Sequence, residues 1–480
     1  MPTPLLDTEH EFRAILALDS VHSATASDAV CGVQPRLVLE PANEQQLAAV
    51  LRLANDANLA VIPRGGGTKL SWGNPPSRAD IILSTARLDK IIEHAWADLT
   101  VSVEAGCTIQ KLQNALAQHG QRLALDPLWP AEATIGGVLS TNDSGSLRLR
   151  FGALRDLIIG VTLALPDGTL ASSGGKVVKN VAGYDLPKLV TGALGTLAVI
   201  TRAIFRLHPL PRNAKTLSIS GCNLEEMQRL ILAVQDSKLA HTALQARIAQ
   251  DAEAIVDILF EGREEGIAAQ EAQLRELARP ATATDAPSTV WAASQELWNS
   301  ANSATVAVAK ITALPASIAH VIETVQRTAS SRKALWKLTM QATGIGWLLL
   351  EAAPENLHAE LSDLRFDLEH AGGSLAALHH PGRPPRRCAT CGRGNVCRAH
   401  AKCGARAFHR EGDRVQRFSR QCRFAGQLSC GCAIAARARR RSGCARRLRE
   451  DARSRESQSR RGRGGRFGWC EPAGLRALPR

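Results

Sequence analysis

The stretch Val61-Ile-Pro-Arg-Gly-Gly-Gly-Thr-Lys-Leu-Ser-Trp-Gly73 decides how this sequence folds. The apolar run over residues 59–63 predicts a buried strand, and three consecutive glycines follow it directly. Because glycine adopts dihedrals that other residues resist, successive N–H groups of such a loop can turn toward one anion. The glycines are contiguous, so the loop matches neither G-x-G-x-x-G nor a Walker loop. A flexible surface turn is the alternative, and this segment alone leaves both open.

The sequence on either side alternates strand and helix patterns. An apolar stretch ends at Val38 and Leu39, and Pro41-Ala-Asn43 opens a helix whose apolar positions are Leu47, Val50, Leu51 and Ala54. After the loop we expect strands at 81–83, 100–104, 158–165 and 197–202, a helix at 109–118, and a tight turn at Pro166-Asp-Gly168.

A second region follows Pro209 to Pro211. Amphipathic helices are expected at 224–235, 263–277 and 318–328, between short strands such as 254–260 and 305–311. Pro280 to Ser288 is expected to be an exposed loop. The chain of 480 residues therefore divides into residues 1–212, a smaller α+β domain at 213–375, and a remainder at 376–480.

Charge separates the remainder from the body. Residues 381–480 hold 27 Lys plus Arg against 6 Asp plus Glu, whereas residues 1–380 hold 32 against 39, so the net charge of +14 comes from the tail. Nine of the 12 cysteines lie there too, and 26 of its 27 basic residues are arginine. A G+C-rich gene translated in a wrong frame gives this composition, so we interpret the tail as the product of a frameshift near residues 375–385.

Two alternatives for the tail stay open. One is a disordered basic arm that binds nucleic acid or an acidic membrane. The other is a metal site, since Cys388-Ala-Thr-Cys391 has zinc-knuckle spacing and Cys397 and Cys403 could add two thiolates. The later spacings fit no common zinc or iron-sulfur pattern, so we expect no metal.

Two further clusters of small residues accompany the glycine loop. Asp126-Pro-Leu-Trp-Pro-Ala-Glu-Ala-Thr-Ile-Gly-Gly137 continues into Val-Leu-Ser-Thr-Asn-Asp-Ser-Gly145, a pattern that brings backbone donors close to a flat ring. The third cluster comprises Asn180-Val-Ala-Gly-Tyr-Asp-Leu-Pro-Lys188 and the run from Gly192 to Ile200. Its Tyr184, the only tyrosine of the chain, is suited to stacking on a ring system or to structural packing.

In this order the three clusters resemble the FAD-binding domain of the vanillyl-alcohol oxidase (PCMH-type) superfamily, and in particular the FAD-binding subunit of bacterial glycolate oxidase. The likeness is close over about residues 36–208 and loose over 213–375. It implies an α+β fold: a PCMH-type two-subdomain FAD-binding domain, a smaller α+β cap domain whose helices cover the substrate side of the flavin, and an irregular, disordered tail.

The resemblance also implies the residues that bind FAD. The loop Arg64, Gly65, Gly66, Gly67, Thr68, Lys69 and Leu70 would hold the pyrophosphate. Pro130, Thr134, Gly136, Gly137, Ser140, Asn142, Ser144 and Gly145 would line the isoalloxazine and ribityl region, with Val199 and Ile200 near the adenine.

Three departures from the family pattern matter. Covalent members carry a histidine after the glycine pair, where Thr68 and Lys69 stand here, so we expect noncovalent FAD. The histidine-rich stretch of relatives that oxidise 2-hydroxy acids directly is missing, so the catalytic residues stay unassigned. The Asn-Pro-Gly-Arg-like C-terminal segment of the family is missing too, in agreement with the frameshift hypothesis.

The resulting functional hypothesis is the FAD-binding subunit of a glycolate oxidase complex that oxidises glycolate to glyoxylate. Expected partners are a second flavoprotein subunit, an iron-sulfur subunit and a small 2-hydroxy acid, without nucleic acid. The alternatives are a self-sufficient FAD-dependent dehydrogenase of another hydroxy acid or alcohol, and a basic-tailed nucleic-acid or membrane adaptor. Because the N-terminal segment does not resemble a secretory signal, we expect a cytoplasmic protein, with peripheral attachment to the inner membrane through the complex as an alternative.

Overall fold

The computed structural model describes residues 5–175, 184–299, 301 and 303–380. The predictions for the Arg- and Cys-rich tail beyond residue 380, and for Asn180 to Gly183, lie outside these residues. No helix among the described residues is long and apolar enough to cross a membrane.

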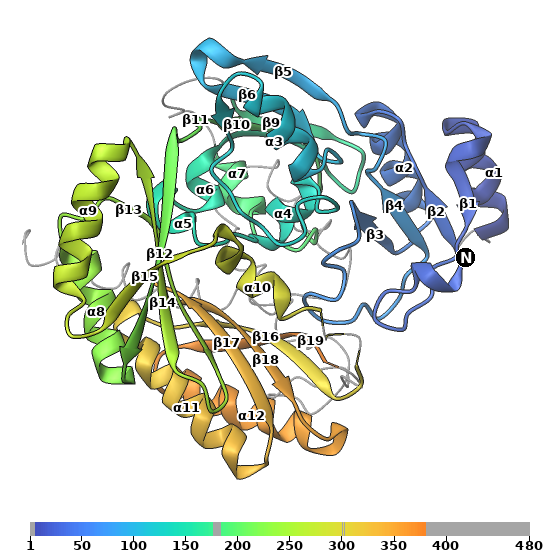
Figure 1. The fold of residues 1–480 in the computed structure, drawn as a ribbon. Coiled ribbons are helices and arrows are strands. Elements are labelled where there is room, and N and C mark those ends of the chain that lie inside the picture. The colour runs from blue at the N-terminus through green and yellow to red at the C-terminus, as the bar shows by residue number, and fades with distance from the viewer. Residues whose placement is uncertain (1–4, 176–183, 300, 302, 381–480) are drawn as a thin grey trace, which may run out of the picture. The chain divides into compact units, whose positions relative to one another are not determined.

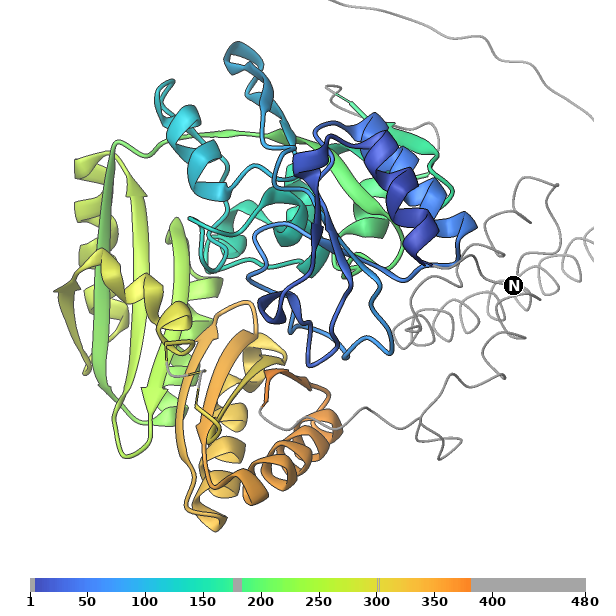
Figure 2. The same ribbon diagram turned by 90° about the vertical axis from the view of Figure 1, so that its right-hand side faces the viewer.

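The glycine loop follows a strand of a small mixed sheet with the strand order β1-β2-β4-β3. Strands β2, β4 and β3 are parallel, and β1 is antiparallel to β2. Helices α1 and α2 lie side by side against this sheet (Figure 1, Figure 2). Asn43 caps α2 by accepting the Gln46 N–H at 2.9 Å. The elements are α1 (Leu5–Ile15), β1 (Val21–Ser23), β2 (Leu37–Leu39), α2 (Glu44–Asp56), β3 (Val61–Arg64) and β4 (Ile81–Ser84).

A five-stranded antiparallel sheet follows, in the order β5-β6-β10-β8-β9. Its residues Ala164 and Val199 are buried in the core of the first sheet, so the two sheets pack as one body. The strands are β5 (Ile91–Ala95), β6 (Thr100–Glu104), β8 (Ile158–Ala164), β9 (Leu170–Gly174) and β10 (Val199–Arg206). The helices are α3 (Ile109–Ala117), α4 (Ile135–Thr141), α5 (Arg148–Phe151), α6 (Leu154–Leu157) and α7 (Leu186–Val190).

The second region forms an eight-stranded antiparallel sheet in the order β15-β12-β14-β13-β17-β18-β16-β19. Its long helices α8, α9, α11 and α12 lie on the face turned away from the first two sheets (Figure 1). The strands are β12 (Asn213–Cys222), β13 (His241–Ala249), β14 (Ala254–Gly262), β15 (Thr282–Ala286), β16 (Val306–Thr312), β17 (Leu335–Gln341), β18 (Ile345–Glu351) and β19 (Ser374–His379). The helices are α8 (Leu224–Asp236), α9 (Glu264–Leu277), α10 (Ala293–Glu296), α11 (Ile318–Ser331) and α12 (Pro354–His370).

A short strand pair and an ion pair lie where the chain passes from the first region into this sheet. The short strand β11 (His208–Pro209) pairs with β7 (Gln121–Arg122). Next to this pair, the Arg122 guanidinium donates two hydrogen bonds of 2.7 and 2.6 Å to the Glu261 carboxylate. This ion pair is largely buried and fixes the start of the second region against the first.

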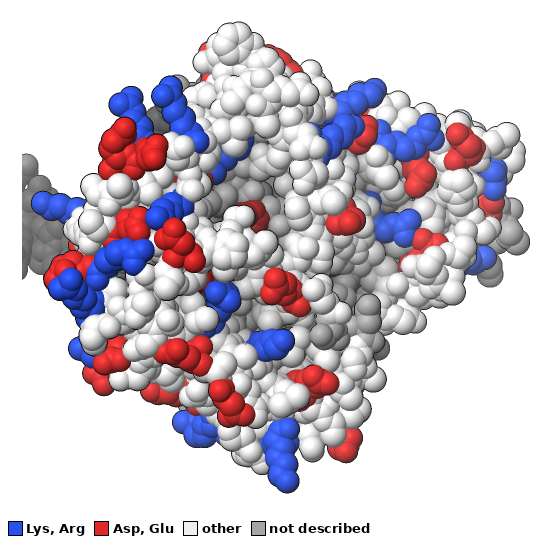
Figure 3. All heavy atoms as spheres, in the orientation of Figure 1, with Lys and Arg blue, Asp and Glu red and all other residues white. Residues whose placement is uncertain are grey.

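The α+β fold class is confirmed, and the expected elements are present with boundaries shifted by a few residues. One expectation is wrong: residues 280–288 are not simply an exposed loop, because β15 pairs with the edge of β12 over five residues. The expected end of the second region at residue 375 falls inside β19, which runs to His379 and pairs with β16. Charges of both signs are interspersed on the face in Figure 3, as expected for a body without a strong net charge.

Candidate functional site

The glycine loop, residues 65–69, offers a row of free backbone donors. Within the described part of the chain, the N–H groups of these five residues donate no hydrogen bond. The loop begins where β3 ends, and the Arg64 carbonyl accepts the Thr85 N–H at 2.8 Å. The Arg64 side chain forms a 2.6 Å ion pair with Asp28, which lowers the pKa of that carboxyl. The loop therefore offers backbone amides to an anion, while the Arg64 side chain is already paired with Asp28.

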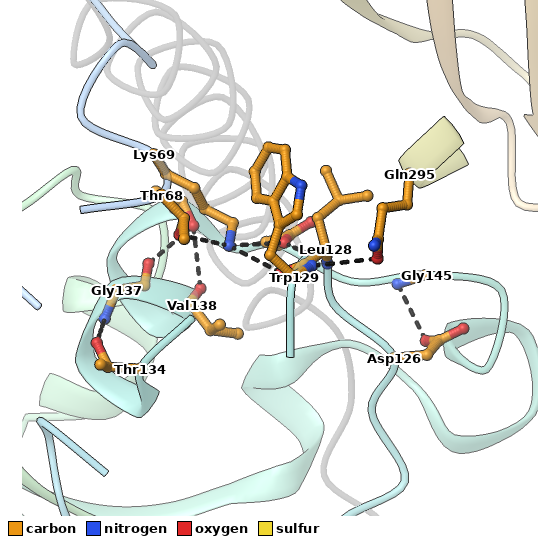
Figure 4. A network of polar contacts seen from close by, with 12 residues as sticks. Thr68, Lys69, Asp126, Leu128, Trp129, Thr134, Gly137, Val138, Gly145 and Gln295 are labelled. Carbon is orange, nitrogen blue, oxygen red and sulfur yellow. Dashed lines mark hydrogen bonds and ion pairs between the residues drawn. The ribbon is translucent and has the colours of Figure 1, made fainter. Parts of the chain in front are cut away.

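The loop is pressed against the second cluster. A Cβ on Gly66 would lie 1.8 Å from the Glu132 carbonyl oxygen, and one on Gly65 would lie 2.0 Å from Thr134 Oγ1. Only glycine permits this approach. Thr134 is the N-cap of α4, where its Oγ1 accepts the Gly137 N–H at 3.4 Å (Figure 4). The structure thus brings the first and second clusters together.

The third cluster contacts the second cluster through the backbone of Gly192 and Leu194. The Gly192 N–H donates to the Leu139 carbonyl at 2.9 Å, and the Leu194 N–H donates to the Ser140 carbonyl at 2.7 Å. Both acceptors belong to the last turns of α4. Tyr184 does not share in this assembly, since its side chain is 82% exposed and its packing in a core is ruled out.

A buried ion pair lies behind the glycine loop. Lys69 Nζ is 3.2 Å from Asp143 Oδ2, and both side chains are almost inaccessible to solvent. The same ammonium donates to the Leu128 carbonyl at 3.3 Å and lies 5.2 Å from the ring centroid of Trp129 (Figure 4). Burial lowers the pKa of Lys69, and the Asp143 charge opposes that shift. Lys69 therefore contributes its backbone N–H to the loop while its side chain holds the second cluster.

Asp126 organises the following turn. Its carboxylate accepts the N–H groups of Gly145 at 3.0 Å and Leu147 at 3.2 Å. Desolvation of the carboxylate raises the pKa of Asp126 to about 7, although these hydrogen bonds favour the charged form. The bonds occupy both carboxylate oxygens, so the residue holds the turn in place.

A cavity lies where this turn meets the eight-stranded sheet. Its empty volume, including the solvent mouth, is about 380 Å³. The side-chain oxygen of Gln295 on α10 accepts the backbone N–H of Trp129 at 3.4 Å (Figure 4). Helix α10 therefore contacts the second cluster at one side of the cavity. The lining includes Asp126, Ser144, Gly145, Gln295, Gln341 and Trp347. Within the second region, α10, the short turn before it, and strands β17 and β18 line this cavity. The expectation that helices of this region cover the substrate side of the flavin stays a prediction.

The predicted site residues fall into three groups. Ser144 and Gly145 line the cavity, and Gly65 to Lys69 form the loop with the free amides. Others support the backbone: Pro130 accepts a hydrogen bond from Gln110, Gly136 donates one to Ala105, and Asn142 ends α4 in the left-handed conformation. Leu70 packs against a small core, and Val199 and Ile200 are buried in the cores of the two sheets. The predicted contact of Val199 and Ile200 with adenine stays a prediction.

The sequence did not reveal the contribution of the second region. Gln295, Gln341 and Trp347 come from three separate segments that no local pattern connects to the glycine loop. Asp143, between two predicted residues, was also missed. No sequence pattern indicates that the Asp143 side chain is buried next to Lys69, and only the folded structure shows it.

Comparison with known proteins agrees with this geometry. Residues 35–174 match the FAD_binding_4 family, described as an FAD binding domain. The structure resembles that of p-cresol methylhydroxylase with a TM-score of 0.66 and 14% identity, covering 78% of this chain and 89% of that one. Residues 35–174 are therefore identified as an FAD-binding domain, the fold is of the PCMH type, and FAD is the cofactor.

Two curated relatives each match part of the chain. The D-lactate dehydrogenase of Archaeoglobus fulgidus is 37% identical over 200 residues, which are 41% of this chain and 44% of that protein. The glycolate oxidase subunit GlcD of Bacillus subtilis is 31% identical over 211 residues, 44% of this chain and 45% of the subunit. The matched segment thus spans less than half of the length of either relative.

The residues present fit the cofactor. An FAD diphosphate needs several hydrogen-bond donors, and the amides of residues 65–69, which donate no hydrogen bond within the described residues, are available to it without a charged side chain. The Glu132 carbonyl occupies the position that a Cβ of Gly66 would take, so the loop can lie this close to the second cluster only with glycine at residue 66.

Proposed function

We propose that the protein is an FAD-dependent oxidoreductase that acts on the CH–OH group of a small 2-hydroxy acid. The observation that carries this proposal is the row of unpartnered amides at residues 65–69, held against α4 next to a cavity. The two curated relatives support the substrate class, since their names specify D-lactate and glycolate.

The roles of the chain's own residues follow from the site. FAD supplies the two-electron acceptor, a chemistry that side chains alone do not provide. The loop amides bind its diphosphate, and the Thr134 cap with the Lys69–Asp143 pair fixes the backbone around them. Trp347 and Gln295 line the cavity. We assign no base for the substrate hydroxyl proton, because the Asp126 carboxylate is held by two backbone amides.

More narrowly, we propose the FAD-binding subunit of a glycolate oxidase complex with noncovalently bound FAD. Since no base is assigned among the described residues, we propose that a second flavoprotein subunit shares the reaction and that an iron-sulfur subunit carries the electrons onward. The complex would operate in the cytoplasm or attached peripherally to the inner membrane.

The test is a visible absorption spectrum of the purified full chain, followed by anaerobic addition of glycolate and then of D-lactate. A flavin band that dithionite bleaches, but neither acid does until the partner subunits are added, supports the subunit. Release of the flavin on denaturation supports noncovalent binding. Failure to take up FAD, even when it is supplied in excess, overturns the proposal.

A second candidate is a self-sufficient D-lactate dehydrogenase, which the 37% identity to that enzyme favours. Bleaching of the isolated chain by D-lactate would select it. The adaptor hypothesis depends on residues 381–480, outside the described structure, and predicts binding that weakens steeply with salt.

A further inference from the structure

Two basic side chains, Lys310 and Arg148, lie next to residues that line the cavity. Lys310 on β16 is the ladder partner of Trp347 on β18, and its Nζ lies 5.3 Å from the centroid of that indole. Arg148 begins α5, and its Nη1 lies 3.5 Å from Ser144 Oγ. Trp347 and Ser144 both line the cavity, so the two cations stand directly behind its walls.

Neither cation has a counter-charge at ion-pair distance among the described residues. The other buried charges nearby are compensated, since Lys69 pairs with Asp143, and Arg247 pairs with the fully buried Asp257. Partial burial lowers the pKa of Lys310 and of Arg148, although both side chains keep some contact with solvent. An unpaired cation in such a place is costly, and a bound anion removes that cost.

Charges of both signs lie around the cavity. The Lys69–Asp143 pair is neutral as a unit, and Asp126 on the same wall accepts two backbone amides. The Asp143 charge raises the pKa of Lys310 and the Asp156 charge raises that of Arg148, but neither carboxylate lies at ion-pair distance, and Gln341 and Gln295 add uncharged polar groups. This combination of two cations and neutral donors around a small space suits a compact carboxylate with an adjacent hydroxyl.

We propose that this cavity binds the carboxylate of the substrate, with Lys310 and Arg148 as its counter-charges. The inference rests on the proposed function and deepens it, because it names the residues that select a 2-hydroxy acid over a neutral alcohol. A neutral alcohol leaves both cations unpaired, so it binds more weakly.

The test measures binding of oxalate, a carboxylate with no CH–OH group to oxidise, to the flavin-loaded full chain. Loading first with FAD excludes the cofactor's own diphosphate as the occupant. Calorimetry and the shift of the flavin spectrum give the dissociation constant for the wild type, for Lys310→Met and for Arg148→Met. Loss of one charged hydrogen bond predicts binding weaker by about tenfold or more in each variant.

Matched controls exist on the same elements. Lys337→Met removes an exposed lysine from β17, and Arg150→Met removes an exposed arginine from α5. Both controls should bind oxalate as the wild type does. Lys310→Arg keeps the charge and should retain most of the affinity. If it loses as much as Lys310→Met, the effect is structural and the proposal is overturned.

Unchanged affinity in Lys310→Met and Arg148→Met also overturns it, as does a flavin-loaded wild type that does not bind oxalate. A different result would overturn the proposed function and leave the anion site standing. If oxalate binds with the predicted dependence on both residues, but no 2-hydroxy acid reduces the flavin with or without partner subunits, the anion site stands and the activity is wrong.

Discussion

Glu360 is a carboxylic acid buried without a partner. It lies on α12, is fully inaccessible to solvent, and neither of its carboxyl oxygens has a hydrogen-bond partner among the described residues. Desolvation raises its pKa to about 7, the charge of Arg332 opposes the shift, and that of Asp363 adds to it. Arg332 does not neutralise Glu360, because its guanidinium is bound to Asp363 at 2.6 Å.

The sign of the effect on stability follows from this raised pKa. The folded state prefers the protonated acid, so the contribution is fully present below pH 4.5 and is lost as pH rises through 7. Against an ordinary value of 4.5, a pKa of about 7 corresponds to roughly 3 kcal/mol, most of it lost between about pH 5 and pH 8. Glu360→Gln has the shape of the neutral acid and cannot ionise.

We therefore expect Glu360→Gln to match the wild type within about 1 kcal/mol at pH 5 and to exceed it by roughly 2 to 3 kcal/mol at pH 8. The assay is urea unfolding of both proteins at several pH values. Asp126, whose pKa is also about 7, titrates in both proteins and cancels in the difference. Glu369→Gln changes an exposed acid on the same helix and should show no such divergence. Parallel pH profiles for wild type and Glu360→Gln would refute the reasoning.

Three further predictions concern the site and the junction. Gly66→Ala places a Cβ against a backbone carbonyl and should lower FAD affinity by at least about tenfold in a flavin titration, whereas Gly266→Ala, which meets nothing within 4 Å, should not. Asp143→Asn leaves the Lys69 ammonium buried and unpaired and should cost about 3 to 5 kcal/mol in urea unfolding; adding Lys69→Met should recover part of this, and no recovery would contradict a charge effect. Arg122→Met removes two charged hydrogen bonds across the junction and should cost about 2 kcal/mol, seen as earlier unfolding in urea; an unchanged midpoint would show that the ion pair contributes nothing.

Local periodicity was sufficient to predict most of the elements. The apolar spacing of Leu47, Val50 and Leu51 predicts α2, and all three side chains are buried there. The turn Pro166-Asp-Gly168 joins β8 to β9 as expected, with Gly168 at a φ of 78°. These features depend on residues close in sequence, which is why pattern alone identifies them.

Contacts between residues far apart in the sequence could not be predicted from local periodicity. Thr282–Ala286 has a polar, Ala-rich sequence typical of a loop, and it becomes a strand because the edge of β12 is available. The convergence of the three glycine clusters could be expected only from the family resemblance. The wall formed by Gln341 and Trp347 could not, because it depends on the folding of a sheet whose sequence resembles the family only loosely.

The tryptophan cluster gives the protein an optical reporter of its own site. Trp72, Trp298 and Trp347 lie with ring centroids 5.5 to 6.1 Å apart, and Trp129 contacts Trp298 at 5.0 Å. These are four of the eight tryptophans of the chain. Their emission depends on the polarity and charge of the junction between the glycine loop and the large sheet. Cofactor uptake, anion binding and opening of that junction can therefore be followed by fluorescence without attaching a label.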